Sequence, residues 1–286
     1  MKINLAKSAG FCFGVKRAIK IALETAHNNT GIDMLGDIVH NDHVAEDIKN
    51  AGIKKIARLI RGKNKILLIR AHGVPLKTIE KANKLGYRVI DATCPMVKGI
   101  HRIAAAMEKQ KRTVIVIGDK NHAEVRGIIG HLNRKPFLID DEHGIILPAL
   151  KKIKKACVIV QSTQDIEKVK RIFSVLKRHI RDIKFFNTIC GTTKAKQNEI
   201  RTMPLKNDIM LIIGSKTSAN TKRLYEIAKS LNNKSYWVGS GKDLRPAWFR
   251  NARSVGVTAG ASTPDYAIRE VITRVKQYSS KNNPRN

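Results

Sequence analysis

The chain has 286 residues, 42% of them hydrophobic, which is enough to bury the core of one large domain or of two to three small ones. Its four cysteines are too few and too unevenly spaced for a disulfide framework, so we expect reduced thiols and a cytoplasmic protein. Residues 1–15 show no secretory signal, and the apolar runs, such as 209–213, are far shorter than the roughly 18 residues of a membrane span.

The net charge is +32, from 55 Lys+Arg against 23 Asp+Glu, and such a surface attracts polyanions. Nucleic-acid binding is therefore one interpretation. However, the basic residues are spread along the whole chain, and aromatic residues, which stack on bases, make up only 5% of it. We favour an ordinary solvated basic surface and expect no specific nucleic-acid partner, although the same charge would attract an acidic protein.

Apolar runs rich in β-forming residues alternate with amphipathic stretches along the chain. Helical spacing of apolar residues is clear within residues 96–107 and 169–176. This alternation predicts an α/β protein with mostly parallel sheets, in which ligands gather at the carboxyl ends of the strands. The expected strands are residues 65–69, 87–90, 113–117, 156–160, 183–186, 208–213, 235–238 and 254–258.

Three cysteines lie in distinctive segments, one in each third of the chain: Cys12 in GFCFGV, Cys94 in DATCP and Cys190 in NTIC. Each lies near the end of a strand and the start of a helix, where the helix dipole favours the metal-binding thiolate. Three thiolates from distant stretches can hold a metal centre and leave one coordination position open. The fourth cysteine, Cys157, lies in an apolar strand and is expected in the core.

Several polar motifs accompany these cysteines. Two of them, around Ser218 and Asn220 and around Ser262, place small hydroxyl and amide residues between a strand and a helix, where they can donate to phosphate oxygens. One such motif alone would be an ordinary N-cap. Their combination with histidine motifs favours a phosphate pocket, although the P-loop spacing is absent. The histidine motifs contain His40, His72 and His122.

Glu124 lies two residues after His122 and follows an expected strand. A carboxylate beside an imidazole can form a proton relay, because proton donors need positioning and a tuned pKa. The alternative is an acidic residue that stabilises the N-terminus of a helix through its dipole.

Together these motifs resemble the 4-hydroxy-3-methylbut-2-enyl diphosphate reductase family, iron–sulfur enzymes of the non-mevalonate isoprenoid pathway. The resemblance runs from the motif around Cys12 to the motif around Ser262. It implies a trefoil of three similar small α/β domains around a central iron–sulfur cluster. The expected domains are residues 13–94, residues 95–189, and residues 190–278 together with 1–12, followed by a frayed tail at 279–286.

The same resemblance implies a role for each motif. It implies a [4Fe–4S] cluster with three cysteine ligands, Cys12, Cys94 and Cys190, and with a fourth iron not held by cysteine. Glu124 matches the carboxylate that delivers protons, and Ser162 matches a position near the substrate hydroxyl where the family usually has threonine. The residues that match the diphosphate pocket are His40, His72, His122, Ser218, Asn220 and Ser262.

The implied reaction is the reductive dehydroxylation of the allylic diphosphate to isopentenyl diphosphate and dimethylallyl diphosphate. Two electrons pass through the cluster, and the implied donor is reduced ferredoxin or flavodoxin. The chain departs from the family at Ala123, Lys196 and Ala219, where proline, arginine and serine are common.

Two other function classes compete with this interpretation. A nucleic-acid-binding protein with a structural zinc would need closely spaced cysteine pairs, which the sequence lacks. A hydrolase with a cysteine nucleophile would need one reactive thiol and would leave two of the three cysteine segments unexplained.

Overall fold

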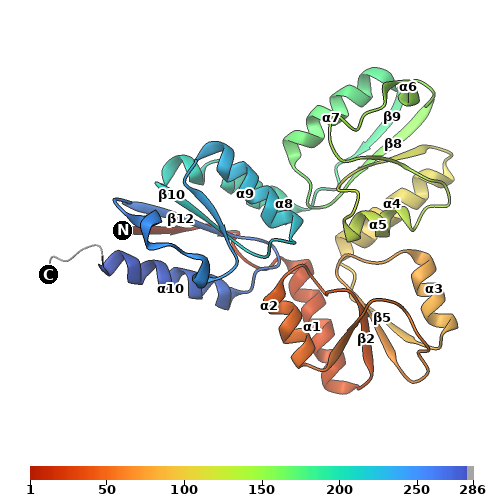
Figure 1. Cartoon of the computed structure of the whole chain (residues 1–286). Coiled ribbons are helices and arrows are strands. Elements are labelled where there is room, and N and C mark those ends of the chain that lie inside the picture. The colour runs from red at the N-terminus through yellow and green to blue at the C-terminus, as the bar shows by residue number, and fades with distance from the viewer. Residues whose placement is uncertain (282–286) are drawn as a thin grey trace. The chain divides into compact units, whose positions relative to one another are not determined.

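The computed structural model describes residues 1–281, and in this part of the chain the strands form three four-stranded sheets (Figure 1). Residue contacts divide the chain into two compact units. The terminal unit comprises residues 1–15, 40–46 and those from Gly191 onward. The central unit comprises residues 16–39 and 47–190 and contains two of the sheets.

The first sheet of the central unit has the strand order β3-β2-β4-β5, with every neighbouring pair parallel. All four residues of β4 are buried, as expected for an inner parallel strand that is covered on both faces. Leu67 and Ile69 of this strand pack with Ala82 of α3. The elements are α1 (Phe13–Asn28), β2 (Ile32–Leu35), α2 (Asp42–Asn50), β3 (Ile53–Ile56), β4 (Ile66–Ile69), α3 (Leu76–Lys84) and β5 (Arg88–Asp91).

The second sheet of the central unit has the order β7-β6-β8-β9 and is also parallel. Successive residues of β8 point to opposite faces, so Val158 packs with α7 while Cys157 packs with α4 and α5. Cys157 is fully buried, as expected from the sequence. The elements are α4 (Pro95–Lys109), β6 (Thr113–Ile117), α5 (Ala123–Ile129), β7 (Phe137–Ile139), α6 (Leu147–Leu150), β8 (Lys155–Val160), α7 (Ile166–His179) and β9 (Asp182–Phe186).

The sheet of the terminal unit has the order β1-β12-β10-β11, so the first strand of the chain pairs with the last. Leu211 faces the core shared with α10, and Met210 and Ile212 face the core shared with α9. The elements are β1 (Lys2–Leu5), α8 (Gly191–Ile200), η1 (Met203–Lys206), β10 (Ile209–Ile213), α9 (Ala219–Leu231), β11 (Ser235–Val238), η2 (Gly241–Asp243), η3 (Pro246–Phe249), β12 (Ser254–Ala259) and α10 (Asp265–Lys281).

The three sheets share one topology. In each, the first strand lies between the second and the third, and the fourth strand pairs with the third. In the terminal unit, β1 takes the place of the fourth strand. The loops after the first, third and fourth strands therefore occupy equivalent places in each sheet, and these loops carry the candidate residues.

The expected α/β class, with three small α/β parts built on parallel sheets, is confirmed. All eight expected strands are present, each within one residue of its expected bounds. The four further strands are short, with three or four residues each: β1, β2, β3 and β7.

The expected domain boundaries stay a prediction. Helix α10 continues through residues 279–281, which we expected to begin a frayed tail, because this amphipathic helix packs against the terminal sheet up to its last turns. The rest of the expected tail, residues 282–286, lies outside the described residues.

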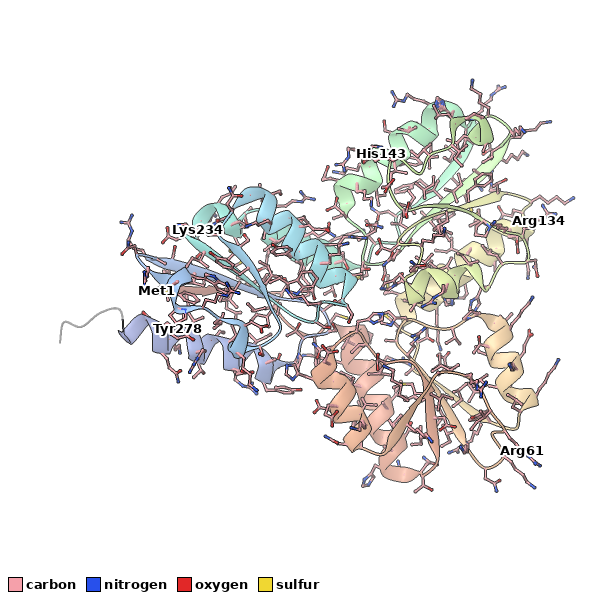
Figure 2. All side chains as sticks on the ribbon, in the orientation of Figure 1. Met1, Arg61, Arg134, His143, Lys234 and Tyr278 are labelled. Atoms are coloured by element: carbon pink, nitrogen blue, oxygen red, sulfur yellow. The ribbon has the colours of Figure 1, made fainter. Side chains whose placement is uncertain are left out.

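No helix between residues 1 and 281 combines the length and the apolar character that a membrane crossing requires. Basic side chains project into solvent from all three sheet-and-helix parts, as Arg61, Arg134 and Lys234 illustrate in Figure 2. The interpretation of the net positive charge as an ordinary solvated surface stays a prediction.

Candidate active site

The three candidate cysteines occupy equivalent places in the fold. Each follows the fourth strand of its sheet and directly precedes the first residue of a helix. The backbone amide of each donates to a carbonyl oxygen in the loop after the third strand of the same sheet. These bonds join Cys94 to Ala71 at 2.9 Å, Cys190 to Ser162 at 3.0 Å and Cys12 to Ala261 at 3.1 Å.

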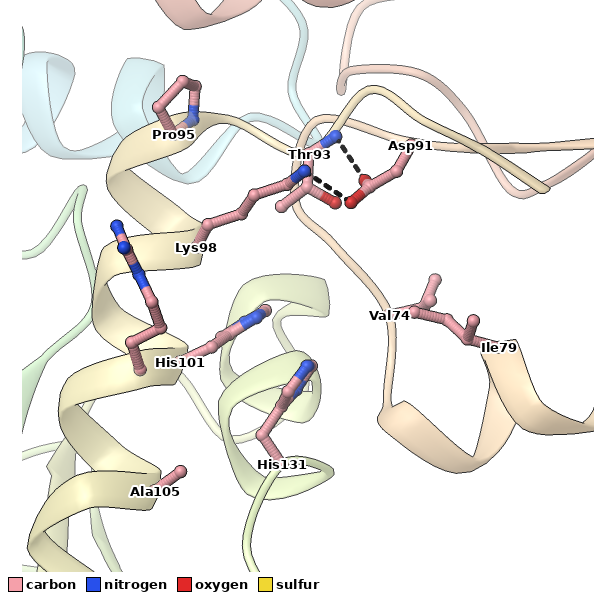
Figure 3. A pocket seen from close by; sticks show the side chains of 10 residues that line it. Val74, Ile79, Asp91, Thr93, Pro95, Lys98, His101, Ala105 and His131 are labelled. Atoms are coloured by element: carbon pink, nitrogen blue, oxygen red, sulfur yellow. Dashed lines mark hydrogen bonds and ion pairs between the residues drawn. The ribbon is translucent and has the colours of Figure 1, made fainter.

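The loop that carries Cys94 is fixed by a carboxylate. Asp91 accepts a hydrogen bond from the Thr93 amide at 2.8 Å and forms an ion pair with Lys98 at 2.6 Å (Figure 3). Pro95 then begins α4, with Cys94 as its N-cap, as the sequence predicted.

None of these three cysteines, which lie within residues 1–281, forms a disulfide, and their donor chemistry fits a metal centre. Cys12 Sγ accepts a hydrogen bond from the Val15 amide at 3.4 Å in the first turn of α1. Burial raises the pKa of the Cys94 thiol, whereas hydrogen bonds from the Met96 and Val97 amides lower it. A cationic metal centre would offset the effect of burial and deprotonate such thiols.

Glu124 lies in the first turn of α5 and is only 1% exposed. Its Oε1 accepts from the Ser162 amide at 2.6 Å and its Oε2 from the Ser162 hydroxyl at 2.7 Å. Burial raises the pKa of this carboxyl, although the Ser162 hydrogen bonds act in the opposite direction. Glu124 therefore keeps its proton to higher pH than an exposed glutamate, which suits a proton donor.

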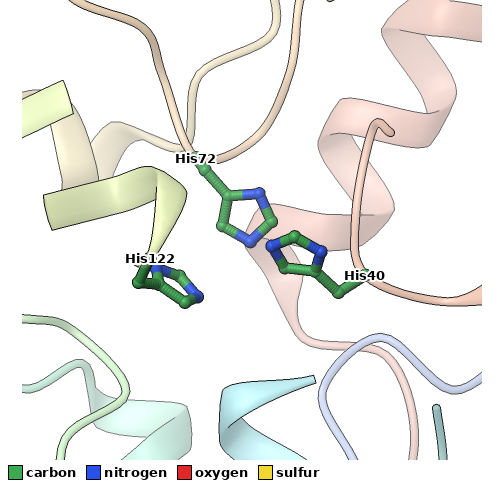
Figure 4. Close-up of side chains that lie close together, drawn as sticks. All are labelled: His40, His72 and His122. Atoms are coloured by element: carbon green, nitrogen blue, oxygen red, sulfur yellow. The ribbon is translucent and has the colours of Figure 1, made fainter. Parts of the chain in front are cut away.

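His122 is the N-cap of α5, where its Nδ1 accepts from the Glu124 amide at 3.2 Å. The proton of the neutral ring is therefore on Nε2. The ring of His72 lies edge to face with it, with centroids 5.3 Å apart (Figure 4). Two imidazoles from neighbouring loops of the central unit can thus act as donors to one anion.

The terminal unit contains a second group of polar residues. Ser218 is the N-cap of α9, where its Oγ accepts from the Thr221 amide at 3.3 Å, so the expected cap is present and the hydroxyl proton can still be donated. Asn220 is 6% exposed, and its side-chain Nδ2 has no hydrogen-bond partner within residues 1–281. A buried, unpaired amide donor is expected where a ligand oxygen binds. Ser262 donates its hydroxyl to the His40 carbonyl oxygen at 3.0 Å.

The loop that leads to Cys12 is held by α8. Lys196 is completely buried, and its Nζ donates to the carbonyl oxygens of Ser8, of Gly10 at 3.1 Å and of Ala259 at 2.9 Å. Glu199, one turn later, accepts from the amide of Ser8 at 2.9 Å. The three carbonyls take up the three donors of the ammonium group, which makes burial of the charge tolerable.

Sequence reasoning treated Lys196 only as a departure from the family and gave His101 no role. Both lie at positions where helical spacing places a core residue. The buried residues of α8 are Thr193, Lys196, Gln197 and Ile200, and those of α4 include Val97, Ile100, His101 and Ala104. A polar residue on the apolar face of a helix was the signal that could have identified them.

The structure thus brings the expected residues together in two groups. The central unit joins one group through the contacts described above: His72, Cys94, His122, Glu124, Ser162 and Cys190. The terminal unit holds the other: Cys12, His40, Ser218, Asn220 and Ser262. That the two groups form one site stays a prediction.

Comparison with known proteins identifies the family. The family described as "LytB protein" matches residues 3–276. The 4-hydroxy-3-methylbut-2-enyl diphosphate reductase of Aquifex aeolicus is 36% identical over 282 residues, which cover 96% of both chains. The enzyme of the same name from Campylobacter fetus is 38% identical over 283 residues, covering 98% of this chain and 99% of the relative.

Solved structures agree with this family. The structure of an (E)-4-hydroxy-3-methyl-but-2-enyl diphosphate reductase, described as the terminal enzyme of the non-mevalonate pathway, has 36% identity and a TM-score of 0.71. It covers 97% of this chain and 100% of its own. The Plasmodium falciparum E-1-hydroxy-2-methyl-but-2-enyl-4-diphosphate reductase has 27% identity and a TM-score of 0.87, covering 95% of this chain and 87% of its own.

The fold and the family define an oxidoreductase of the iron–sulfur class. The chain belongs to the LytB family, as the resemblance of its motifs implied. This membership leaves the zinc-protein and hydrolase alternatives without support.

Proposed function

We propose that this chain catalyses the reductive dehydroxylation of 4-hydroxy-3-methylbut-2-enyl diphosphate to isopentenyl diphosphate and dimethylallyl diphosphate. The observation that carries the proposal is near-full-length similarity to reductases of that name, in a chain whose three candidate cysteines occupy equivalent loops of its three sheets. In the reaction, one C–O bond breaks, a C–H bond forms, two electrons and two protons are consumed, and water leaves.

Three cysteine ligands for a [4Fe–4S] cluster are part of this proposal: Cys12, Cys94 and Cys190. Their support is that each is a cysteine outside any disulfide, at the start of a helix and in the same loop of its sheet. When bound, the cluster supplies the two electrons one at a time. The protein must bind the diphosphate, orient the hydroxyl and deliver protons.

Two kinds of hydrogen-bond donors bind the diphosphate in the proposed pocket. Imidazoles of His40, His72 and His122 can donate charge-assisted hydrogen bonds to phosphate oxygens. Ser218 and Asn220, at the start of α9, add neutral donors and the positive end of the helix dipole. The hydroxyl of Ser262 completes the proposed pocket. The unpartnered Nδ2 of Asn220 supports this assignment, because a phosphate oxygen would satisfy it.

Proton delivery falls to Glu124. Its buried carboxyl has a raised pKa and contacts the hydroxyl of Ser162 at 2.7 Å, so a proton can pass from the carboxyl through that hydroxyl to a leaving oxygen. The arrangement favours Ser162 as the partner of the carboxylate, since His122 is bonded to the Glu124 backbone amide.

Anaerobic purification and reconstitution, followed by iron and sulfide analysis and a turnover assay with the allylic diphosphate, test the proposal. We expect about four irons per chain and conversion to both five-carbon diphosphates. A chain that binds iron stoichiometrically but leaves the substrate unchanged with a strong reductant would refute the activity.

The source of the electrons is a further part of the proposal. We infer a reduced ferredoxin or flavodoxin in the cytoplasm, since such carriers are acidic and the net charge of this chain is +32.

A further inference from the structure

His101 lies where three parts of the central unit meet. It is on the buried face of α4, two turns after Cys94, and is only 6% exposed. Its ring contacts the loop after β4 at Gly73 and helix α5 at Gly127. The loop carries His72, and the helix carries Glu124 with His122 as its N-cap.

Both contacts are so close that a side chain in place of either glycine would displace the ring or the backbone. Gly73 has φ +71°, and a Cβ built on it would lie 2.9 Å from Cε1 of His101. A Cβ on Gly127 would lie 3.2 Å from Nε2 of His101 and 3.4 Å from the carbonyl oxygen of His72. The ring therefore fills the space between the two backbones so tightly that an added methyl group would force a shift.

One face of the His101 ring is covered by His131, whose ring stacks on it with centroids 3.9 Å apart and an interplanar angle of 25°. His131 Nδ1 donates to the Gly127 carbonyl oxygen at 2.8 Å, so this stack is itself tied to α5. Beside the stacked rings lies a cavity of about 530 Å³ lined by Val74, Lys98 and Arg102 (Figure 3). The cavity leaves the loop room to shift if the ring of His101 is removed.

His101 has the properties of a spacer and not of an acid, base or hydrogen-bonding group. Its Nε2 is buried and has no hydrogen-bond partner in the described part of the chain. Burial, and then the neighbouring His131, lower its pKa to about 4, so the ring is neutral at physiological pH.

We propose that His101 is a positioning residue for diphosphate binding, whose ring sets the separation of the His72 and His122 rings. This inference rests on the proposed function, because it assumes that the two histidines bind the diphosphate. The centroid distance of 5.3 Å between those rings depends on how far the loop stands from α5, and the ring of His101 fixes that distance.

The test compares two substitutions of different shape. His101→Phe keeps a planar ring between the two backbones, although it removes both nitrogens and is slightly larger, so we expect KM and Kd to stay much closer to wild type than in His101→Ala. His101→Ala removes the ring, and we expect KM for the allylic diphosphate and Kd for inorganic diphosphate to rise about tenfold, as for one misplaced charge-assisted hydrogen bond. Gly127→Ala, which pushes the ring away, should raise both constants in the same way.

Met107→Ala is the matched control, because Met107 is also buried on α4 but packs in the sheet core. It should lower the melting temperature without changing Kd, and iron content should be equal in all variants. Equal behaviour of His101→Phe and His101→Ala, or an unchanged Kd in His101→Ala, would overturn the inference. Failure of the wild type to bind inorganic diphosphate would instead refute the proposed pocket.

Discussion

At the scale of single residues, Glu124 shows how burial and hydrogen bonding compete. Two hydrogen bonds from Ser162 favour the carboxylate, whereas its 1% exposure favours the acid, and burial is the larger effect. The net result is a group that keeps its proton at a pH where exposed glutamates have lost theirs.

We predict that Glu124→Gln lowers kcat at least about a hundredfold, because the amide cannot donate the proton that the leaving oxygen needs. Iron content should match wild type, which separates proton delivery from cluster binding. For the wild type, kcat should fall as the pH rises through the raised pKa of Glu124. An unchanged kcat in the variant would contradict this role.

The partner of Glu124 gives a second prediction. Ser162→Ala removes the hydroxyl that stabilises the carboxylate, so the pKa of Glu124 should rise further. The alkaline limb of the kcat–pH profile should then move to higher pH, and maximal kcat should fall. Ser162→Thr keeps the hydroxyl and serves as the control. If the alkaline limb moved equally far in Ser162→Thr and in Ser162→Ala, the hydroxyl would not be what lowers the pKa of Glu124.

At the scale of elements, α8 shows how one buried side chain connects segments that are distant in the sequence. Lys196 joins this helix to the segment before Cys12 and to the end of β12. Neither connection is visible in local patterns, because each carbonyl becomes an acceptor only when the fold brings it within reach.

We predict that Lys196→Met lowers the free energy of unfolding of the terminal unit by about 3–5 kcal/mol, since three buried carbonyl acceptors lose their donor. Chemical denaturation of the purified protein would measure this change. Lys194→Met, on the same helix but only half-buried, is the matched control and should stay within about 0.5 kcal/mol of wild type. If Lys196→Met lowered the free energy of unfolding no more than the control does, the hydrogen bonds from Lys196 to the three carbonyl oxygens would contribute little to stability.

The elements that could be predicted from the sequence are those with continuous apolar strands, such as β8 and β10, because parallel strands covered on both faces read as unbroken hydrophobic runs. The strands β1 and β3 were missed because they are short and carry exposed residues at sheet edges. The place of Cys94 was predictable, since Pro95 marks a helix start. The hydrogen bonds of Glu124 were not, because they depend on how two loops approach each other.

At the scale of the whole molecule, the repeated sheet topology explains why site residues recur at intervals in the sequence. The loops after the first strands carry His40, His122 and Ser218, and those after the third strands carry His72, Ser162 and Ser262. The motifs could be found in the sequence, but their equivalent positions could be recognised only once the order of the strands in each sheet was known.

The net charge of +32 belongs to this scale as well. We predict that electron transfer from an acidic carrier protein slows about tenfold or more as ionic strength rises from about 0.01 M to about 0.15 M, because the screening length falls from about 30 Å to about 8 Å. Steady-state rates at limiting carrier concentration would measure this. A small uncharged reductant is the control and should show little salt dependence; equal salt dependence of both would contradict electrostatic attraction.

The pairing of β1 with β12 also orders events during synthesis. Strand β1 has no partner in its sheet until residues 254–259 have been made, whereas both sheets of the central unit can form earlier from consecutive stretches of chain. The bond from Cys12 to Ala261 closes only after that pairing partner exists. Of the three candidate cysteines, Cys12 is thus the last to reach its native loop, and in the proposed cluster site it would be the last ligand to become available.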